Sequence, residues 1–404
     1  MDFSSINFSS SSYMFNGNLS NFLEPSDRIF ISTRGIYINR GGSQIVTQND
    51  IGKTLTKLET LINSEETNIS FDVKPFFIFS KDFNSDPDTN IEVLIPDEMI
   101  HIDPNNRVTH FIISETEIKS DQFTNDILLY PHSIEIISEE SREDFCDKVE
   151  QATKKIANSD LEKVVIARQI NMRSDVNFDT RLVVAQLIDS QPQSYIYSIN
   201  NFVGASPELL VEKFSRTISL LPMAGTRKRH ARTSDDDVDV SDLQTNSKDL
   251  AEHAFLVDNI LSKLSTVAYD IAASPTPKVL RLPHVSHLTT PISATLFKHV
   301  DLLQLVNLLH PTPAVGGTPL DLALDTIDEL ENFDREIYGA PVGWIDSEGN
   351  GQCAIAIRCA KIVGNVATLF AGVGIVLESN AESEFDESQA KFGPMRDALL
   401  NIVR

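Results

Sequence analysis

The stretch CAIAIRCAKIVGNVATLFAGVGIV, residues 353–376, decides the fold that this sequence predicts. Two apolar runs flank Gly364-Asn365, a pair that is typical of a tight turn between antiparallel strands. We therefore expect a hairpin made of the strands Cys353–Val363 and Val366–Val376.

One face of the first predicted strand carries a charged side chain among very small ones. Side chains alternate between the two faces of a strand, which places Arg358 on a face otherwise made of alanines. Open space above a guanidinium favours a pocket floor, where Arg358 can bind a carboxylate through two hydrogen bonds. Gly372 and Gly374 in the second strand support a pocket, since glycines let another group approach the backbone closely. The alternative is a face covered by helices, in which Arg358 pairs with an acidic neighbour.

Antiparallel strands are expected in other parts of the chain as well. Asn200-Asn201 lies between Tyr195–Ile199 and Phe202–Ala205 and tolerates the positive φ of a hairpin turn. Before residue 140, short apolar runs alternate with clusters of Ser, Asn, Asp and Pro, which indicates strands and turns around a helix near Asn49–Asn63. The runs are Arg28–Tyr37, Val73–Phe79, Ile91–Ile95, Val108–Ile113 and Asp126–Tyr130. We find no candidate for chemistry in this part.

Three longer segments have helical spacing. They are Glu139–Asn158, Leu250–Leu264 with its single apolar stripe, and a segment that begins near Ala381. We expect Pro394 to kink or end the last helix, because proline removes a backbone donor and clashes with the preceding turn. Met395–Arg404 would then form a separate turn or helix.

Glu384, Glu387 and Lys391 follow each other at i, i+3 and i+7, so all three share one face of the last predicted helix. Two carboxylates so close together could bind a hard divalent cation, and the lysine could hold a substrate anion. The alternative is a solvated stripe with a favourable Glu-to-Lys pair.

The formal net charge of −24, from 58 acidic and 34 basic residues, argues against nucleic acid or an anionic membrane as the main partner. An anionic small substrate remains compatible with this charge, provided that its site supplies local positive charge from Lys, Arg or a bound cation.

The cysteines and the hydropathy pattern favour the cytoplasm. Cys146, Cys353 and Cys359 have no metal-type spacing and are odd in number, which suits a reducing compartment. The N-terminus has neither a basic start nor an apolar run, and the best apolar window, Ala367–Leu377, is too short to span a bilayer.

Three further charges stand out but have ordinary explanations when taken singly. Lys163 shares a face of the predicted strand Leu161–Met172 with apolar neighbours, Glu208 follows Pro207, and Glu252 lies off the apolar stripe of its helix. Isolated charges of this kind are usually on the surface. The phosphate-binding loop and the dinucleotide-binding, G-x-S-x-G and H-E-x-x-H motifs do not occur in the sequence.

Taken together and in order, nine segments resemble the chorismate-binding enzyme family, which includes isochorismate, salicylate, anthranilate and aminodeoxychorismate synthases. The segments are LEKVVIAR, FVGASPELL, MAGTRKR, KDLAEH, LHPTPAVGGTP, REIYGAPVGW, AIAIRCA, LFAGVGIV and ESEFDESQAK. The resemblance implies an α+β fold in which large, mainly antiparallel sheets pack face to face with helices on the outside. It divides the chain into residues 1–140, a variable part of the same α+β unit, and residues 141–404, the chorismate-binding catalytic region.

The resemblance also implies roles for individual residues. Lys163 matches the general base of isochorismate synthases, and Glu208 matches their general acid. Glu252 and Glu387 match the two carboxylates that hold Mg²⁺. The implied substrate-binding positions are Gly225, Thr226, His310, Ala314, Tyr338, Arg358, Gly372, Glu384 and Lys391.

These roles make physical sense for chorismate, which is a dianion. Mg²⁺ would supply positive charge at the ring carboxylate, with Arg358 on the pyruvyl carboxylate. Water attack at C2 needs a base, and loss of the C4 hydroxyl needs an acid, so Lys163 would be neutral and Glu208 protonated. Both states reverse the ordinary ionisation at pH 7, so burial or neighbouring charges must disfavour the charged forms.

The loop HPTPAVGGTP, residues 310–319, resembles isochorismate synthases more than the amine-forming members of the family. Salicylate synthases, which go on to eliminate pyruvate, are the second choice. IRCA, GGTP and the chain length resemble enzymes that supply 2,3-dihydroxybenzoate for catecholate siderophores, upstream of an isochorismatase, more than those of the menaquinone pathway. A monomer is expected. Two alternatives belong to other functional classes: a chorismate-binding relative without turnover, and a purely structural protein.

Overall fold

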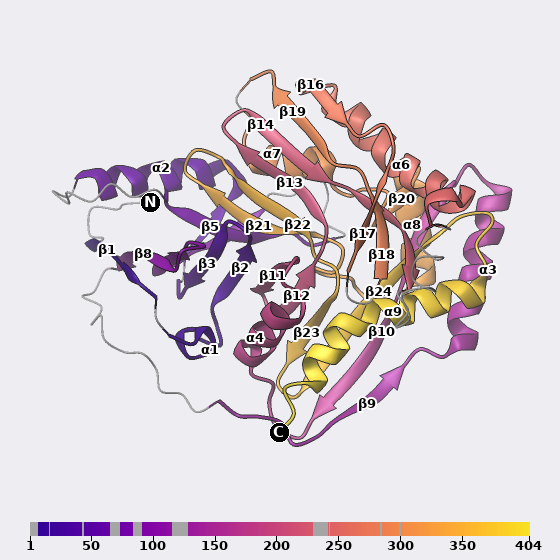
Figure 1. Ribbon diagram of the computed structural model, residues 1–404, viewed down its shortest axis with the longest axis horizontal. Coiled ribbons are helices and arrows are strands. Elements are labelled where there is room, and N and C mark those ends of the chain that lie inside the picture. Colours follow the sequence, from indigo (N-terminus) through magenta and orange to yellow (C-terminus); the bar gives the residue numbers. More distant parts are fainter. Residues whose placement is uncertain are drawn as a thin grey trace.

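The computed structural model describes residues 7–15, 17–42, 44–64, 73–83, 91–114, 128–228, 241, 243–282, 285–298 and 300–404. Two large sheets dominate it (Figure 1). The larger has 12 strands: β1 (Asn7–Met14), β8 (Arg107–Ser114), β7 (Glu98–Ile102), β3 (Gly35–Arg40), β2 (Arg28–Ser32), β11 (Tyr195–Ile199), β12 (Phe202–Ser206), β23 (Cys359–Val363), β24 (Val366–Ile375), β10 (Lys163–Ser174) and β20 (Gly317–Thr318) in this order, with β9 (Ile134–Glu139) beside β10.

The second sheet has seven strands and faces the first. Its order is β16 (Ala268–Ala273), β19 (Ile292–Leu296), β14 (Thr217–Leu221), β13 (Leu209–Phe214), β22 (Gly351–Ile355), β21 (Pro341–Asp346) and β5 (Phe76–Ser80). A three-stranded sheet of β15 (Met223–Lys228), β18 (Val285–Thr289) and β17 (Lys278–Arg281) and a pair of β4 (Gln44–Thr47) and β6 (Glu92–Ile95) complete the described strands.

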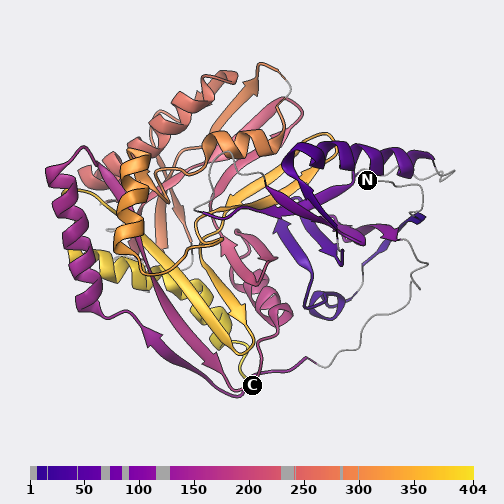
Figure 2. The ribbon, with the colours of Figure 1, turned by 180° about the vertical axis from the view of Figure 1, so that it is seen from behind.

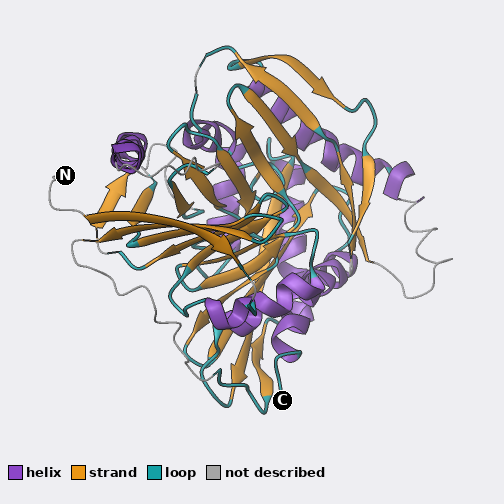
Figure 3. Ribbon diagram, turned by 60° about the vertical axis from the view of Figure 1, so that its left-hand side comes forward, coloured by secondary structure: helices purple, strands orange, loops and turns teal. Residues whose placement is uncertain are grey.

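Helices lie around these sheets, and Figure 3 shows the strands stacked through the middle of the molecule. The described helices are α1 (Leu19–Phe22), α2 (Gln48–Ser64), α3 (Arg142–Asn158), α4 (Thr180–Ser190), α6 (Ser247–Leu264), α7 (Leu302–Leu309), α8 (Leu320–Leu330) and α9 (Ala381–Leu400). Seen from behind, α2 and α3 lie at opposite ends of the molecule (Figure 2). The predicted α+β class, with large antiparallel sheets and helices outside, is confirmed.

The central strands of the larger sheet are buried on both faces. Along β11, Tyr197 packs into a core between the two sheets, while its neighbour Ile196 packs into a second core beneath α4 and α9. Alternation of side chains between the faces of a strand produces this division. Burial of both faces explains why central strands such as β12 and β24 are nearly continuous apolar runs in the sequence.

Strands from before residue 140 pair directly with later ones. β2 pairs with β11 in the larger sheet, and β5 pairs with β21 in the smaller one. The division of the chain at residue 140 stays a prediction. One predicted strand, Asp126–Tyr130, is not observed: residues 128–130 form no strand, and 126–127 lie outside the described residues.

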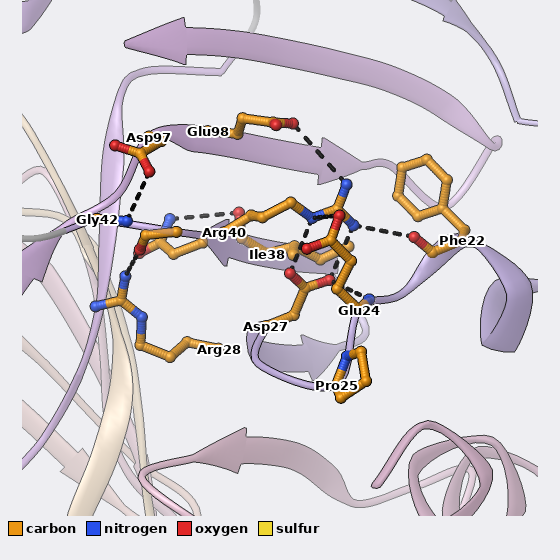
Figure 4. A network of polar contacts seen from close by, with 12 residues as sticks. Phe22, Glu24, Pro25, Asp27, Arg28, Ile38, Arg40, Gly42, Asp97 and Glu98 are labelled. Atoms are coloured by element: carbon orange, nitrogen blue, oxygen red, sulfur yellow. Dashed lines mark hydrogen bonds and ion pairs between the residues drawn. The ribbon is translucent and has the colours of Figure 1, made fainter. Parts of the chain in front are cut away.

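A polar network ties the first strands together (Figure 4). Arg40 on β3 donates from Nε and Nη2 to the two carboxylate oxygens of Asp27, each at 2.9 Å, and Nη2 also donates to the Phe22 carbonyl. Arg28 on β2 donates to the carbonyls of Leu94 and Gly41 at 3.0 and 2.8 Å. A bidentate arginine–carboxylate pair is geometrically specific, so this network fixes the turn before β2 against β3.

The prediction that the helix ends at Pro394 is wrong, because α9 continues to Leu400; the predicted kink there stays a prediction. A proline inside a helix costs about 3 kcal/mol through the lost hydrogen bond and the steric clash. Phe392, Met395 and Leu399 on either side of it are buried in the core beneath α4 and α9. Tertiary packing of this kind supplies most of the stability of a helix in a protein and overrides the local preference.

A buried ion pair joins the end of α8 to β10. Arg335, 1% exposed, donates from Nε to Glu331 at 2.8 Å and from Nη2 to the Val165 carbonyl at 2.7 Å. Glu331 also accepts from the Ala167 amide at 2.7 Å. The loop after α7 is held as well, since Arg335 Nη1 donates to the Val315 carbonyl at 2.8 Å.

We expect Glu331→Gln to lower the free energy of unfolding by about 3–5 kcal/mol, because it leaves the buried Arg335 cation without its counterion. Urea unfolding measures the change. Glu329→Gln, which removes the exposed partner of Lys155, is the matched control and should leave stability unchanged. Equal stability of Glu331→Gln and the unmodified protein would contradict this account of the pair.

Candidate active site

A cavity opens where the three-stranded sheet, α6 and α9 meet the ends of β10 and β24. Its empty space, with the open solvent at its mouth included, is about 610 Å³. The predicted positions that line it are Glu208, Gly225, Thr226, Glu252, Ala314, Tyr338, Arg358, Gly372 and Lys391. Glu208 and Lys391, which lie far apart in the sequence, are thus brought to one place.

Arg358 reaches this cavity from a corner between the sheets and not from a strand face. The predicted strand Cys353–Val363 is wrong: the chain leaves the smaller sheet at Ile355 and enters the larger one at Cys359. Arg358 has a φ of +54°, a left-handed conformation that non-glycine residues rarely adopt. Its side chain is buried and lines the cavity, so the predicted location of the guanidinium is right although the predicted strand is not.

His287 on β18 orients Arg358. Its Nε2 lies 3.1 Å from Arg358 Nη2, and its Nδ1 lies 3.1 Å from Thr226 Oγ1. Burial, and then the nearby Arg358 and Lys391 cations, lower the pKa of His287 well below its ordinary value. The neutral ring therefore accepts from Arg358 at Nε2 and donates from Nδ1 to the Thr226 hydroxyl.

Glu208 lies between β12 and β13 and is 5% exposed. Burial raises the pKa of its carboxyl to about 7, although Arg358, Lys163 and Lys391 oppose the rise. A protonated carboxylic acid is therefore well populated at neutral pH. This is the state that a general acid needs.

Lys163, at the start of β10, is fully buried and does not itself line the cavity, although its partner Glu252 does. Its Nζ lies 2.9 Å from Glu252 Oε1 on α6. Gly374 on the neighbouring β24 makes room for both, because a Cβ there would lie 2.4 Å from Glu252 Oε1 and 2.9 Å from Lys163 Cε.

The predicted face of α9 is not a solvated stripe, and one of its three residues lines the cavity. Lys391 lines the cavity and donates to the Gly372 carbonyl at 2.9 Å. Its Nζ also lies 2.8 Å from Glu387 Oε1, which places Glu387 directly beside the cavity. Glu384, one turn earlier, is 2% exposed and does not line the cavity.

Tyr338 lines the cavity and stacks on Phe370, with ring centroids 5.2 Å apart. Gly372 lets it approach, since a Cβ there would lie 2.7 Å from the tyrosine Oη. His310 lies elsewhere: it ends α7, its Nε2 bonds the Gly339 carbonyl at 3.1 Å, and it does not line the cavity. Burial lowers the pKa of His310 to about 3, so the ring is neutral. Its hydrogen bond to the Gly339 carbonyl gives it a structural role.

The acidic side chains fit a hard divalent cation. Burial raises the pKa of Asp249 to about 6 against the opposing effect of Arg227. The carboxylates of Glu252 on α6 and Glu387 on α9 add to this rise, so both lie close to Asp249. No group of three or more His, Cys, Asp or Glu within the described ranges forms a complete metal cage. Mg²⁺ is commonly held by one or two carboxylates, with waters and substrate oxygens as the other ligands, so the carboxylates of Glu252 and Glu387 have the chemistry to hold it.

We expect Gly374→Ala to lower kcat/KM by about 100-fold or more, because the added methyl displaces Glu252 or Lys163 and a misplacement of about 1 Å is enough for such a loss. Steady-state kinetics with chorismate measures it. Gly52→Ala is the control, since a Cβ there meets nothing within 4 Å. Unaltered kinetics of Gly374→Ala would mean that the tight packing at the base of the cavity is unimportant.

The contacts of three residues at the site do not follow from the sequence. His287 lies 61 and 71 residues from its partners, and a single histidine in a strand predicts nothing. Arg335 occurs in the motif REIYGAPVGW, which does not reveal its ion pair with Glu331. Gly374 has the small size that favours a pocket, but a glycine does not reveal which side chains approach it.

Comparison with known proteins identifies the family. The sequence model of a family described as chorismate binding enzyme matches residues 97–400. The chain belongs to the chorismate-binding enzyme family.

Similar proteins include isochorismate synthases of two pathways. Isochorismate synthase MenF of Bacillus subtilis is 37% identical over 262 residues, which cover 64% of this chain and 56% of that protein. EntC of Escherichia coli K12 is 35% identical over 256 residues, covering 62% and 66%. DhbC of B. subtilis is 33% identical over 269 residues, covering 64% and 68%. The chain matches less than two thirds of the length of the first two.

Solved structures match over nearly the full length. A chain described as the 2,3-dihydroxybenzoate-specific isochorismate synthase DhbC of Bacillus anthracis superposes with a TM-score of 0.76 and 27% identity, covering 94% of this chain and 98% of that one. The menaquinone-specific isochorismate synthase MenF of E. coli shares the fold, with a TM-score of 0.80 at 22% identity over 98% of this chain and 94% of that one. Among the described helices, none combines the length and apolar content needed to cross a membrane.

Proposed function

We propose that this protein is an isochorismate synthase, which converts chorismate to isochorismate with Mg²⁺ as cofactor. The observation that carries the proposal is Glu208, a buried carboxyl with a pKa raised to about 7. It faces the same cavity as Arg358 and Lys391, and Lys163 contacts the cavity-lining Glu252. An acid, an amine and two substrate-binding cations are the groups that the isomerisation requires.

The two proton transfers are assigned to separate residues. Lys163 takes a proton from the water that adds at C2 of the ring. Glu208 gives a proton to the oxygen at C4, which leaves as water while the ring double bonds shift. One water is consumed and one released, so the reaction is an isomerisation.

Arg358 and Lys391 bind the carboxylates of the substrate, which offsets the repulsion that a dianion meets in a protein of net charge −24. His287, which also lines the cavity, accepts a hydrogen bond from the Arg358 guanidinium and so helps to position it. Tyr338, Ala314 and the backbone at Gly225 and Gly372 shape the walls.

Glu252 and Glu387 are the residues that would hold Mg²⁺. When bound there, Mg²⁺ supplies positive charge beside the ring carboxylate. Glu384 supports Glu387 from the preceding turn of α9.

Product identification tests the proposal. Purified protein is incubated with chorismate and either Mg²⁺ or EDTA, and the products are separated by chromatography. Isochorismate that forms only with Mg²⁺ is the expected result. Formation of salicylate and pyruvate would identify the protein as a salicylate synthase. Unchanged chorismate would refute the proposed activity. A chorismate-binding protein without turnover would still show a thermal shift with chorismate and Mg²⁺.

For the pathway, we propose supply of 2,3-dihydroxybenzoate for a catecholate siderophore, where a monomeric cytoplasmic enzyme feeds a downstream isochorismatase. The motifs IRCA and GGTP and the likeness to DhbC and EntC support it, whereas the likeness to MenF supports the menaquinone pathway. Deletion of the gene distinguishes them: loss of dihydroxybenzoate with menaquinone retained is expected, and the reverse would assign the second pathway.

A further inference from the structure

Each of the two proposed metal ligands is already paired with a lysine. Lys163 Nζ lies 2.9 Å from Glu252 Oε1, and Lys391 Nζ lies 2.8 Å from Glu387 Oε1. Both lysines are buried, so water screens these contacts little. An ammonium that contacts a carboxylate also repels a divalent cation at that carboxylate.

The charges of these four side chains balance. Two carboxylates and two ammonium groups sum to zero, and so do one Mg²⁺ and one chorismate dianion. Mg²⁺ alone would be repelled by the two lysine ammonium groups. The dianion alone would be repelled by the two carboxylates, which its binding leaves without counterions. When both ligands enter together, each carboxylate exchanges a lysine for the metal. Lys391 then gains the substrate as counterion, whereas Lys163, no longer paired with Glu252, is the neutral base of the proposed mechanism.

We propose that Lys163 and Lys391 are internal counterions that hold Glu252 and Glu387 in the metal-free protein and release them when Mg²⁺ and the dianion bind together. The inference rests on the proposed function, because it uses the same two carboxylates as metal ligands. Binding of the two ligands is then mutually favourable, and by linkage each must raise the affinity for the other by the same factor.

Lys391 is the sharper of the two to test, because the Gly372 carbonyl already holds its ammonium at 2.9 Å on the cavity wall. Lys391→Met removes the competing cation and keeps the apolar part of the side chain. Calorimetric titration with Mg²⁺, without chorismate, should show binding about tenfold tighter or more than in the unmodified protein. Lys361→Met is the matched control: it breaks a Lys361–Glu336 pair of 2.6 Å outside the cavity and should leave Mg²⁺ affinity unchanged. Unaltered or weaker Mg²⁺ binding by Lys391→Met would overturn the inference.

A second measurement does not depend on the folding of that variant. In Glu208→Gln, which the proposed mechanism expects to be inactive, chorismate serves as an unreacted dianion. Its presence should tighten Mg²⁺ binding about tenfold or more, and equal Mg²⁺ affinity with and without chorismate would also overturn the inference.

Two further variants separate this inference from the proposed function. If Glu252→Gln and Glu387→Gln both retain Mg²⁺ binding, the proposed metal site fails together with the inference. If both lose it while Lys391→Met gains no affinity, the metal site stands and only the counterion role of the lysine fails.

Discussion

Lys163→Ala lowers the turnover of chorismate by about 1,000-fold or more, because the attacking water loses the amine that removes its proton. Chorismate binding persists in this variant, since the cations assigned to the substrate carboxylates, Arg358 and Lys391, are untouched. Steady-state kinetics gives the loss of turnover, and equilibrium titration gives the affinity.

A fully buried side chain also contributes to packing, so two controls accompany this variant. Its thermal unfolding shows whether the fold survives. A small primary amine added to the solution should restore part of the activity if the missing group is a base. Near-normal turnover without added amine would refute the assignment of Lys163.

Glu208→Gln removes a proton donor and preserves shape, and we expect a loss of turnover of about 100-fold or more. The unmodified protein should show a matching pH dependence. Only the protonated carboxyl of Glu208 can donate a proton, and its pKa is about 7. The ionisation of Glu208 therefore makes kcat/KM highest below pH 7. Above it, kcat/KM falls about tenfold for each pH unit as the carboxyl ionises.

The pH profile of kcat/KM from 5.5 to about 9 measures this decline. The matched control is Glu212→Gln on β13, which removes a carboxylate paired with Arg34 outside the cavity and should keep the profile unchanged. A flat profile through pH 9, or a Glu208→Gln protein with normal turnover, would assign proton donation to another group.

Local patterns in the sequence predicted much of the scaffold. The hairpin turn at Gly364-Asn365 and the strand that begins near Lys163 depend on alternation and turn residues, which are properties of a few neighbouring positions. The shared face of Glu384, Glu387 and Lys391 follows from helical periodicity alone. These features need no knowledge of distant contacts.

What could not be predicted depends on contacts between distant segments. Arg358 has a positive φ although it is not a glycine. Its residue type therefore did not predict that the chain passes from one sheet to the other at this position. The continuity of α9 through Pro394 depends on a core that forms only in the folded chain. His310 belongs to a motif that resembles the family, yet its ring turns to a backbone carbonyl instead of the cavity. Likewise the pKa of Glu208 is set by burial, which its position after Pro207 does not reveal.

The corner at Arg358 has a mechanical consequence. Arg358, which we propose binds a substrate carboxylate, lies where the chain passes from one sheet to the other, so its position depends on how the two sheets pack on each other. That fit is set far from the cavity, for example by the stack of Tyr37 on β3 against Trp344 on β21, with centroids 4.1 Å apart. A substitution that lets the two sheets shift relative to each other would therefore move Arg358. We expect such a substitution to change substrate affinity although it alters no residue of the site.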